Sequence, residues 1–384
     1  MVSKQLPEAG GQVFMGTRIT HWNRLRRMTI LCLVILYAWS SVSVQAQDAA
    51  RRLFQQWDRN QDGVLTIQEV PPRARRSFSS IDVNKDGRVT LQEHLSGGRQ
   101  SRPAANKNAV PRWPEADITK LTVRQTWHQE PGGDDRVAFL SVPSRGQGKL
   151  PVVIFFHGNG GVAARVMNQW QYLNDNILVV PQGYRNSWNI TDERSQAPDV
   201  QYVSQLISLV GEQCPRADMQ NVTVIGSSNG SGLIHRLMIE LDEKPFQSAI
   251  LLSASLVTDQ YHQGSFWMPS KTTSNYDTPK QPVPGTEVIY FHGTEDRVVP
   301  YKGGLRGGKQ EHLSAQRTTF LWAKAFGFEG RQLPDSAGQM VEQGIVGYRY
   351  PEVKVVHYKL VGAGHGPGAY EKQVRSMIER AINH

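Results

Sequence analysis

Cysteine is scarce in this 384-residue chain, which contains only Cys32 and Cys214. Cys32 lies in an N-terminal segment that we expect to be removed, so the mature chain has one thiol and no intramolecular disulfide. Cys214 is followed by proline and has no flanking histidine motif, so it is given no catalytic role. With 39% hydrophobic and 20% charged residues, the composition also excludes disordered and fibrous proteins.

Long hydrophobic runs are missing as well. The run Met28 to Trp39 is shorter than the roughly 20 apolar residues that cross a membrane. The basic stretch Arg24 to Arg27 precedes it and Val44-Gln45-Ala46 follows as a cleavage site, which predicts that residues 1–46 are a cleaved export signal. An uncleaved membrane anchor is the alternative, and the position of Cys32 inside the run argues against a lipid anchor. We therefore expect an exported protein, extracellular or periplasmic, with no stable membrane anchor.

The net charge of +9 does not predict a nucleic-acid partner. Residues 1–46 carry five basic residues and one acidic residue, so four of the nine charges belong to the segment that is expected to be removed. The rest of the chain is only mildly basic.

Two loops, at residues 58–69 and 82–93, repeat one pattern of acidic, amide and hydroxyl residues around a central glycine. In an EF-hand loop, positions 1, 3 and 5 turn oxygens inward, Gly at position 6 permits the bend, and Glu at position 12 closes the shell. The repeat predicts two Ca²⁺ sites, while catalysis is expected to need no cofactor. The predicted ligands are Asp58, Asn60, Asp62, Val64, Thr66 and Glu69 in the first loop, and Asp82, Asn84, Asp86, Arg88, Thr90 and Glu93 in the second.

The spacing of the two loops predicts a structural calcium module rather than a sensor. The loops start 24 residues apart, so a short helix from Arg73 to Ile81 is expected to leave the first loop and enter the second. Leu65 and Val89, at position 8 of each loop, are expected to pair through a short strand and to be buried together. Acidic turns without a metal are the alternative.

The module is predicted to span residues 47–95, and a linker of glycine, proline and basic residues follows at 96–116. In the last segment, 117–384, strand-length apolar runs alternate with amphipathic stretches, which indicates a mostly parallel sheet covered by helices. The runs are Val152 to Phe156, Ile177 to Val180, Val222 to Ile225, Ala249 to Leu252, Val288 to Phe291 and Val355 to Leu360.

The chemical signal begins where the run that ends at Ile225 leads into Gly226-Ser-Ser228-Asn-Gly230 and a helical stretch. A G-x-S-x-G sequence between a strand and a helix is the nucleophile elbow of the α/β-hydrolase fold, in which a tight turn exposes the serine hydroxyl. Both glycines are needed because side chains there would collide. The sequence therefore predicts an α/β-hydrolase fold with Ser228 as the nucleophile.

The base and the acid follow in the chain order that this fold uses, the acid first and the histidine last. Asp296 follows the apolar run at 288–291 and His365 follows the one at 355–360, so they are assigned as acid and base. Glu295 is the alternative acid, since a one-residue shift of the loop would exchange the two. His292 is interpreted as a buried structural residue that holds the acid loop.

An oxyanion hole is predicted at His157-Gly-Asn159-Gly-Gly161, a glycine-rich bend after the first long apolar run. The backbone N–H groups of Asn159 and of Asn229, next after the nucleophile, are expected to face the oxyanion, and His157 would brace the loop. A phosphate-binding loop is the alternative, but no Gly-Lys-Ser/Thr follows the glycines.

These motifs resemble the group of secreted α/β hydrolases that contains polyhydroxybutyrate depolymerase-like proteins and feruloyl or acetyl xylan esterases. The resemblance covers the chain from about Leu150 to the C-terminus. The motifs that carry it are the elbow, His292-Gly-Thr-Glu-Asp296, Gly362-Ala-Gly-His365 and two stretches at 181–189 and 197–200. It implies the triad Ser228, Asp296 and His365. The chain departs from the group where Gly366-Pro-Gly follows the histidine in place of Trp-Pro-Gly, and in lacking the group's cysteines, so ester hydrolysis is a firmer expectation than polymer cleavage.

We therefore expect an exported serine carboxylic-ester hydrolase that acts through an acyl-enzyme. Its substrate would be a polyester or an acyl ester linked to polysaccharide. The alternatives are a serine peptidase of related fold and a non-catalytic surface-binding protein organised by calcium. The segment Tyr261 to Tyr276 is expected either to form a wall of the substrate cleft or to be ordinary packing, and the sequence leaves the oligomeric state open.

Overall fold

The computed structural model describes residues 51–383 apart from 73, 76–77, 79–80, 83–85, 96–115, 147, 192, 194, 245, 271–274 and 307–309. The chain divides into two units, Met1–Ala104 and Ala105–His384, and this boundary lies inside the predicted linker. The export signal predicted for residues 1–46 lies outside the described residues. Among the helices that are described, none is long and apolar enough to cross a membrane.

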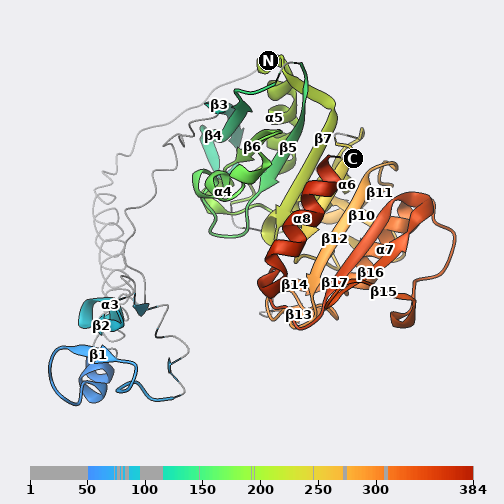
Figure 1. Ribbon diagram of the computed structural model, residues 1–384. Coiled ribbons are helices and arrows are strands. Elements are labelled where there is room, and N and C mark those ends of the chain that lie inside the picture. The colour runs from blue at the N-terminus through green and yellow to red at the C-terminus, as the bar shows by residue number, and fades with distance from the viewer. Residues whose placement is uncertain are drawn as a thin grey trace, which may run out of the picture. The chain divides into compact units, whose positions relative to one another are not determined.

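The first unit contains a short two-stranded sheet (Figure 1). Beneath the sheet is a small apolar core. Strand β1 (Val64–Thr66) pairs antiparallel with β2 (Arg88–Thr90), and helix α3 (Leu91–Leu95) follows. Leu65 lies opposite Val89, and both are 1% exposed, which confirms the predicted pairing of the two loops. The predicted helix from Arg73 to Ile81 lies largely outside the described residues. The buried core consists of Phe54, Leu65, Val70, Phe78 and Val89.

The second unit is built on a sheet of ten described strands in the order β15-β16-β17-β12-β8-β7-β5-β6-β4-β3. The six central strands, β17, β12, β8, β7, β5 and β6, run parallel. At one edge β16 pairs antiparallel with β17, and at the other β4 pairs antiparallel with β6. The strands are β3 (Ala116–Trp127), β4 (Glu130–Pro143), β5 (Leu150–Phe156), β6 (Ile177–Pro181), β7 (Ala217–Ser227), β8 (Ser248–Leu252), β12 (Glu287–Gly293), β15 (Gln339–Glu342), β16 (Ile345–Tyr350) and β17 (Val355–Leu360).

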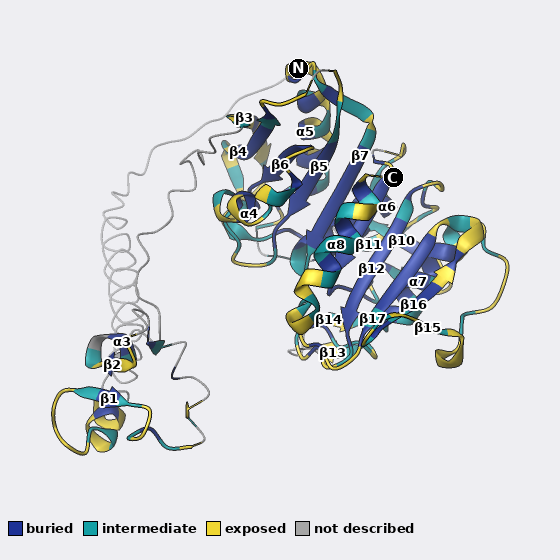
Figure 2. Cartoon of the chain, viewed as in Figure 1, coloured by how far each residue is buried: buried dark blue, intermediate teal, exposed yellow. Residues whose placement is uncertain are grey.

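Helices cover both faces of this sheet, and the strands in the middle are buried (Figure 2). Alternate residues of each strand belong to two separate apolar clusters, because successive side chains point to opposite faces. One cluster packs against α5, α6 and α7, and the other packs against α4 and α8. These helices are α4 (Ala163–Gln169), α5 (Asp199–Gln213), α6 (Asn229–Glu240), α7 (Ala315–Ala325) and α8 (Glu371–Ile382).

Two small sheets lie outside the main one. Strands β9 (Tyr261–His262), β10 (Ser265–Pro269) and β11 (Tyr276–Lys280) form the first, in which Phe266 is buried and packs against Trp322 of α7. The insertion predicted at Tyr261 to Tyr276 is thus, at least in part, ordinary packing. Strands β13 (Gly304–Arg306) and β14 (Gln310–His312) form the second sheet, a hairpin beyond β12.

The sheet order and the position of Ser228 identify the fold. The chain crosses from β5 to β6, returns to β7 beside β5, and then adds β8, β12 and β17 outward in succession. Ser228 lies in the turn between β7 and α6. This is the α/β-hydrolase fold, as the sequence predicted. All six predicted strands are present, and the parallel arrangement brings their carboxyl ends to one edge of the sheet, where the candidate site lies.

Candidate active site

Ser228 occupies a strained turn between β7 and α6. Its φ of 53° and ψ of −117° lie in a region that non-glycine residues rarely adopt, and its N–H donates to Leu252 O at 2.8 Å. A Cβ on Gly230 would lie 2.1 Å from Phe156 O, and one on Gly226 would lie 2.5 Å from Ser231 N. The turn is therefore accessible only with glycine at both positions.

His365 and Asp296 meet at the carboxyl ends of β17 and β12. The distance from His365 Nδ1 to Asp296 Oδ2 is 2.9 Å, and Asp296 is only 5% exposed. Glu295 is exposed, and its N–H donates to Ala363 O at 2.9 Å. A Cβ on Gly293 would lie 2.4 Å from that same carbonyl oxygen, so the acid loop and the histidine loop are in direct contact. The geometry pairs His365 with Asp296 and not with Glu295.

The Asp296 carboxylate is held by four donors. Its Oδ1 accepts hydrogen bonds from the backbone N–H of Val298 at 2.7 Å and from that of Val299 at 2.9 Å. Its Oδ2 is contacted by both histidines, His365 and His292, and the Nε2 of His292 lies 3.2 Å away. Burial alone would raise the pKa of Asp296, but the hydrogen bonds from His292, His365 and the two amides outweigh it and hold the pKa well below its usual range. Asp296 therefore stays ionised wherever the protein is folded near neutral pH.

His292 lies behind the acid, fully buried at the end of β12. Its Nε2 is 2.8 Å from Val299 O, and its Nδ1 is 2.9 Å from the hydroxyl of Tyr290. Tyr290 in turn contacts Ala254 O and lies 3.0 Å from Ser255 Oγ. This polar chain ties the acid loop to the end of β8, which places His292 where the sequence interpretation had it.

Residues at the end of β8 contact both the nucleophile turn and the histidine loop. Leu252 O accepts from the N–H of Ser228, and the next residue, Ser253, accepts with its Oγ from the N–H of Gly366 at 3.0 Å. The turn of Ser228 and the loop of His365 are thereby bound to two adjacent residues, Leu252 and Ser253, at the end of β8. Within the described residues, no hydrogen bond joins the Ser228 hydroxyl to His365. Ser253 was missed from the sequence, because a single serine after a strand carries no motif.

The predicted oxyanion loop lies directly beside the nucleophile. A Cβ on Gly158 would lie 3.5 Å from Ser228 Cβ, so the loop backbone approaches the serine closely. Among the described residues, no acceptor is bound to the backbone N–H of Asn159 or of Asn229. Asn229 begins α6, whose first N–H groups lack intrahelical acceptors. Both amides are therefore free to bind an oxygen.

His157 braces this loop from inside. Its Nε2 accepts from the N–H of Gly183 at 3.0 Å, so its Nδ1 carries the proton and donates to Gly158 O at 2.8 Å. Burial lowers the pKa of His157, which keeps the ring neutral. Gln182 adds a second brace, since its Oε1 accepts from the N–H of Ala163 at 2.9 Å. The role of Gln182 was missed, although its stretch belongs to the sequence resemblance.

The side chain of Asn229 holds the facing loop. Its Oδ1 accepts from the N–H of Trp188 at 2.7 Å, and its Nδ2 donates to Trp188 O at 3.0 Å. Trp188 is fully buried, and its indole N–H donates to His157 O at 2.8 Å. The residue next to the nucleophile therefore links the elbow to the oxyanion loop through one tryptophan.

The two acidic loops of the first unit carry several EF-hand contacts. Asp58 Oδ2 accepts from the N–H of Gly63 at 3.0 Å, and Asp82 Oδ2 accepts from that of Gly87 at 2.9 Å. In each loop the glutamate at position 12, Glu69 or Glu93, accepts with its Oε2 a hydrogen bond of 2.8 Å from the backbone N–H of the threonine at position 9. These hydrogen bonds close each loop around its position 1.

The remaining oxygens of these loops suit a hard cation. Oδ1 of Asp58 and of Asp82 are buried and have no hydrogen-bond partner, as is expected for oxygens that bind a metal. However, no three His, Cys, Asp or Glu side chains of the described residues lie close enough together to hold an ion. The predicted ligand Asn84 lies outside the described residues. Val64 and Arg88, the predicted carbonyl ligands, lie in β1 and β2.

Comparison with known proteins gives one sequence match. Residues 75–93 match the protein-family model described as EF hand, which covers the second acidic loop and not the first. No match to a curated protein sequence was found.

Solved structures of similar architecture include two esterases. The acetyl xylan esterase from Aspergillus awamori is 14% identical, with a TM-score of 0.45 over 69% of this chain and 99% of that one. Esterase 2 of Thermogutta terrifontis is 17% identical, with a TM-score of 0.43 over 71% of this chain and 96% of that one. The fold assignment rests on the sheet order and not on these low-scoring similarities.

Proposed function

We propose that the protein is a serine carboxylic-ester hydrolase. The observation that carries this proposal is the hydrogen bond between His365 Nδ1 and buried Asp296, 2.9 Å long, at the sheet edge where Ser228 occupies a strained turn. A buried acid, a histidine and a serine in the turn between strand and helix are the components of a hydrolytic triad in this fold. A non-catalytic binding protein would have no need for the strain at Ser228.

In this mechanism, Ser228 Oγ attacks the ester carbonyl carbon while His365 Nε2 takes its proton. Asp296 holds the Nδ1 proton of His365 and stabilises the imidazolium. The negative oxygen of the tetrahedral intermediate accepts hydrogen bonds from the N–H groups of Asn159 and Asn229. The alcohol leaves with the proton from His365, and water, deprotonated by the same histidine, then hydrolyses the acyl-enzyme and regenerates the serine.

The natural substrate is proposed to be a polyester or an acyl ester linked to polysaccharide, met outside the cytoplasm. The motif resemblance and the export signal predicted at residues 1–46 support this setting. A serine peptidase is the second candidate. A panel of short-chain nitrophenyl esters, acetylated xylan, polyhydroxybutyrate and peptide amides would separate these substrates.

The first test of the proposal is the substitution Ser228→Ala. Removal of the nucleophile is expected to lower kcat for a soluble nitrophenyl ester by at least about 10⁴-fold, because triad members act as a unit. A fluorophosphonate probe should label the unmodified protein and leave the variant unlabelled. Ser208→Ala, at an exposed position of α5, is the matched control and should keep most activity. Labelling of the Ser228→Ala variant, or equal activity of the variant and the unmodified protein, contradicts the assignment.

For the first unit, we infer that both acidic loops bind Ca²⁺. The EF-hand match at residues 75–93 supports the second site. The first site is supported by the same residue pattern and by the equivalent unpartnered oxygen of Asp58. The ion would supply charge compensation to the clustered carboxylates and so stabilise the small core of this unit.

A further inference from the structure

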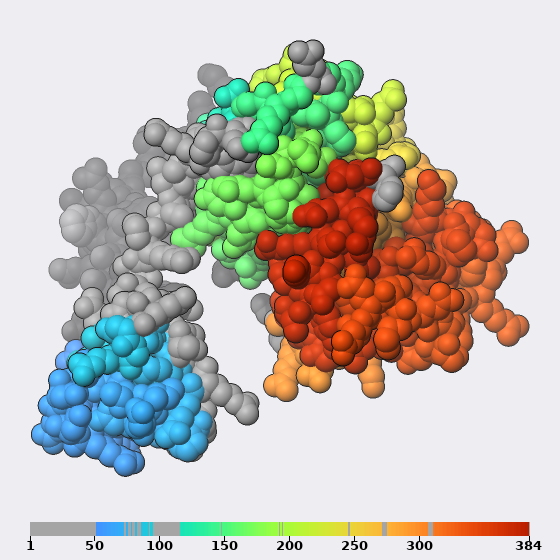
Figure 3. All heavy atoms as spheres, in the orientation of Figure 1, coloured from blue at the N-terminus to red at the C-terminus, as the bar shows by residue number. Residues whose placement is uncertain are grey.

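The loop that carries His365 is rich in glycine and largely exposed. Residues 362–368 contain four glycines, three of them with positive φ. A Cβ on any of the four would meet no heavy atom of the described residues within 4 Å, adjacent residues apart. The loop leads into α8, which lies on the visible face of the second unit in Figure 3. Packing at the glycines therefore contributes nothing to holding His365, and its position depends on contacts made elsewhere in the loop.

The first half of this loop is fixed by the acid loop at the end of β12. The N–H of Gly362 donates to Thr294 Oγ1 at 2.8 Å. The hydrogen bond between His365 Nδ1 and Asp296 joins the same two loops. These contacts place the histidine relative to the acid. They do not determine how far its other ring nitrogen, Nε2, lies from Ser228, which follows a different strand.

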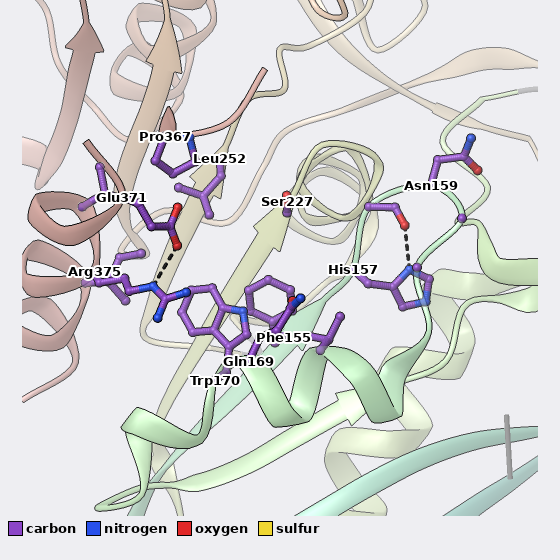
Figure 4. A pocket seen from close by; sticks show the side chains of 16 residues that line it. Phe155, His157, Asn159, Gln169, Trp170, Ser227, Leu252, Pro367, Glu371 and Arg375 are labelled. Carbon is purple, nitrogen blue, oxygen red and sulfur yellow. Dashed lines mark hydrogen bonds and ion pairs between the residues drawn. The ribbon is translucent and has the colours of Figure 1, made fainter. Parts of the chain in front are cut away.

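The second half of the loop is fixed by Ser253, at the end of β8. Its Oγ accepts a hydrogen bond of 3.0 Å from the N–H of Gly366, the residue after His365. Pro367 comes next, and Figure 4 shows it beside Leu252, where both line a cavity of about 360 Å³ between α4 and α8. The chain that leaves His365 therefore lies against the end of β8.

The end of β8 is in turn fixed to the nucleophile turn. Leu252 O accepts from the N–H of Ser228 at 2.8 Å and from Ser231 Oγ at 3.0 Å. The N–H of Leu252 donates back to Ser231 Oγ at 2.9 Å, and Ser231 is fully buried in the first turn of α6. Ser253 is the residue after Leu252, so its hydroxyl has a fixed position relative to Ser228.

Ser253 is itself a strained residue. Its φ of 54° lies in the left-handed region that residues with a Cβ rarely adopt, and it is only 4% exposed. Its N–H donates to Phe291 O at 2.9 Å, which continues the pairing of β8 with β12. Glycine would adopt this conformation without strain, so the serine hydroxyl is what the position gains in exchange. Strain of this kind clusters at functional sites.

We propose that Ser253 is a positioning residue of the ester hydrolase, whose hydroxyl holds the loop of His365 so that Nε2 reaches the hydroxyl of Ser228. Asp296 then fixes the tautomer of the histidine, and Ser253 fixes its distance from the nucleophile. A displacement of about 1 Å at a reacting group costs on the order of 10²-fold in rate, so a single hydrogen bond is enough to control kcat. This inference rests on the proposed ester hydrolysis.

The first test is Ser253→Ala, which removes the hydroxyl and keeps the Cβ. Its kcat for a soluble nitrophenyl ester should fall about 10- to 100-fold. KM should change less than about twofold, because His365 serves both formation and hydrolysis of the acyl-enzyme and the two steps slow together. Ser248→Ala is the matched control and should leave kcat unchanged. Ser248 is also buried on β8, at its other end, where its Oγ donates to Glu287 Oε2 at 3.1 Å.

The variant Ser253→Gly separates a loss of position from a loss of stability. Glycine relieves the strain at this φ, so urea should unfold this variant no more easily than Ser253→Ala. Its kcat should nevertheless fall as far, since the hydroxyl is missing from both variants. If Ser253→Gly keeps its kcat while Ser253→Ala loses it, backbone strain and not the hydroxyl governs the site, and the proposal is wrong.

A double-mutant cycle with His365→Ala shows whether Ser253 acts through the histidine. In the His365→Ala background, Ser253→Ala should change the residual kcat less than about twofold, because the group that Ser253 positions is already absent. A serine with a merely structural role would lower the activity by the same factor in both backgrounds.

The outcomes distinguish this inference from the proposed function. If the protein hydrolyses the ester through Ser228 but Ser253→Ala keeps its kcat, or loses the same factor with and without His365, the positioning role is wrong and ester hydrolysis stands. If no ester is hydrolysed and no fluorophosphonate label forms, both proposals fail.

Discussion

At the scale of single residues, the choice between two adjacent acids decides the proposed chemistry. Asp296 is buried against His365, whereas Glu295 is exposed and engages the histidine loop through its backbone. Asp296→Asn should therefore lower kcat by about 10⁴-fold, because the histidine loses the partner that fixes its tautomer. Glu295→Gln, the matched control, should retain most activity. Nitrophenyl ester kinetics on both variants would check this, and the reverse pattern would move the acid role to Glu295.

The surroundings of Asp296 also predict a pH dependence of stability. The pKa of Asp296 is lowered on folding. Its contribution to the free energy of unfolding is therefore fully present above the unfolded pKa of about 4 and is lost as the pH falls below that value. Asp296→Asn has no such ionisation. The difference in unfolding free energy between the unmodified protein and this variant should therefore decrease below pH 4, by at most about 1.4 kcal/mol per pH unit. Urea unfolding from pH 6 to pH 3 measures it, and a difference that is constant over this range would contradict the assigned hydrogen bonds.

At the scale of elements, a buried ion pair joins strand β4 to the start of α5. Arg136 Nη2 lies 2.5 Å from Asp199 Oδ1, and these side chains are 1% and 0% exposed. Asp199 Oδ2 also accepts from the N–H of Asn189 at 2.6 Å, next to the Trp188 that Asn229 holds. The pair thus anchors the loop that faces the elbow to the edge of the sheet.

This anchor should matter far more than an exposed pair on the same hairpin. Asp199→Asn is expected to lower the free energy of unfolding by about 3–5 kcal/mol, because it leaves the Arg136 charge buried and uncompensated. Arg124 and Asp135 form an ion pair 3.0 Å long with side chains 56% and 62% exposed, so Asp135→Asn should cost less than about 1 kcal/mol. Urea denaturation compares the two variants. Equal losses would show that the buried pair does not hold these elements together.

At the scale of the whole molecule, the two units are expected to respond differently to calcium. Removal of Ca²⁺ should destabilise residues 51–95, since a ligand stabilises only the fold that binds it. Turnover of a soluble ester by the second unit should persist. Hydrogen exchange of the full chain in EDTA, with activity measured in parallel, tests both expectations.

Variants of the loops provide the matched comparison. Glu93→Gln removes a proposed calcium ligand and should weaken the protection that calcium gives, whereas Asp117→Asn, an acid of the second unit, should leave it unchanged. Loss of activity at once in EDTA, restored by calcium, would show instead that the two units are coupled. Unchanged hydrogen exchange with and without calcium would remove the calcium proposal.

The sequence by itself determined the features whose cause is local. The elbow around Ser228 follows from two glycines between a strand and a helix, and the paired loops follow from residues at fixed spacing. The central parallel strands were predictable because they are buried on both faces and therefore read as continuous apolar runs. In the same way, Leu65 opposite Val89 followed from loop position alone.

Only the tertiary structure decided what depends on residues far apart in the chain. The antiparallel strands β3, β4, β15 and β16 were not predicted, and β3 and β15, at the two edges of the sheet, are largely exposed strands with mixed side chains and no continuous apolar run. The pairing of Asp296 with His365 spans 69 residues, and the side-chain contacts of Gln182 and Ser253 are likewise non-local. The cavity between α4 and α8 exists because two helices separated in sequence cover one face of the sheet without closing over β7 and β8, a consequence of packing that no local pattern encodes.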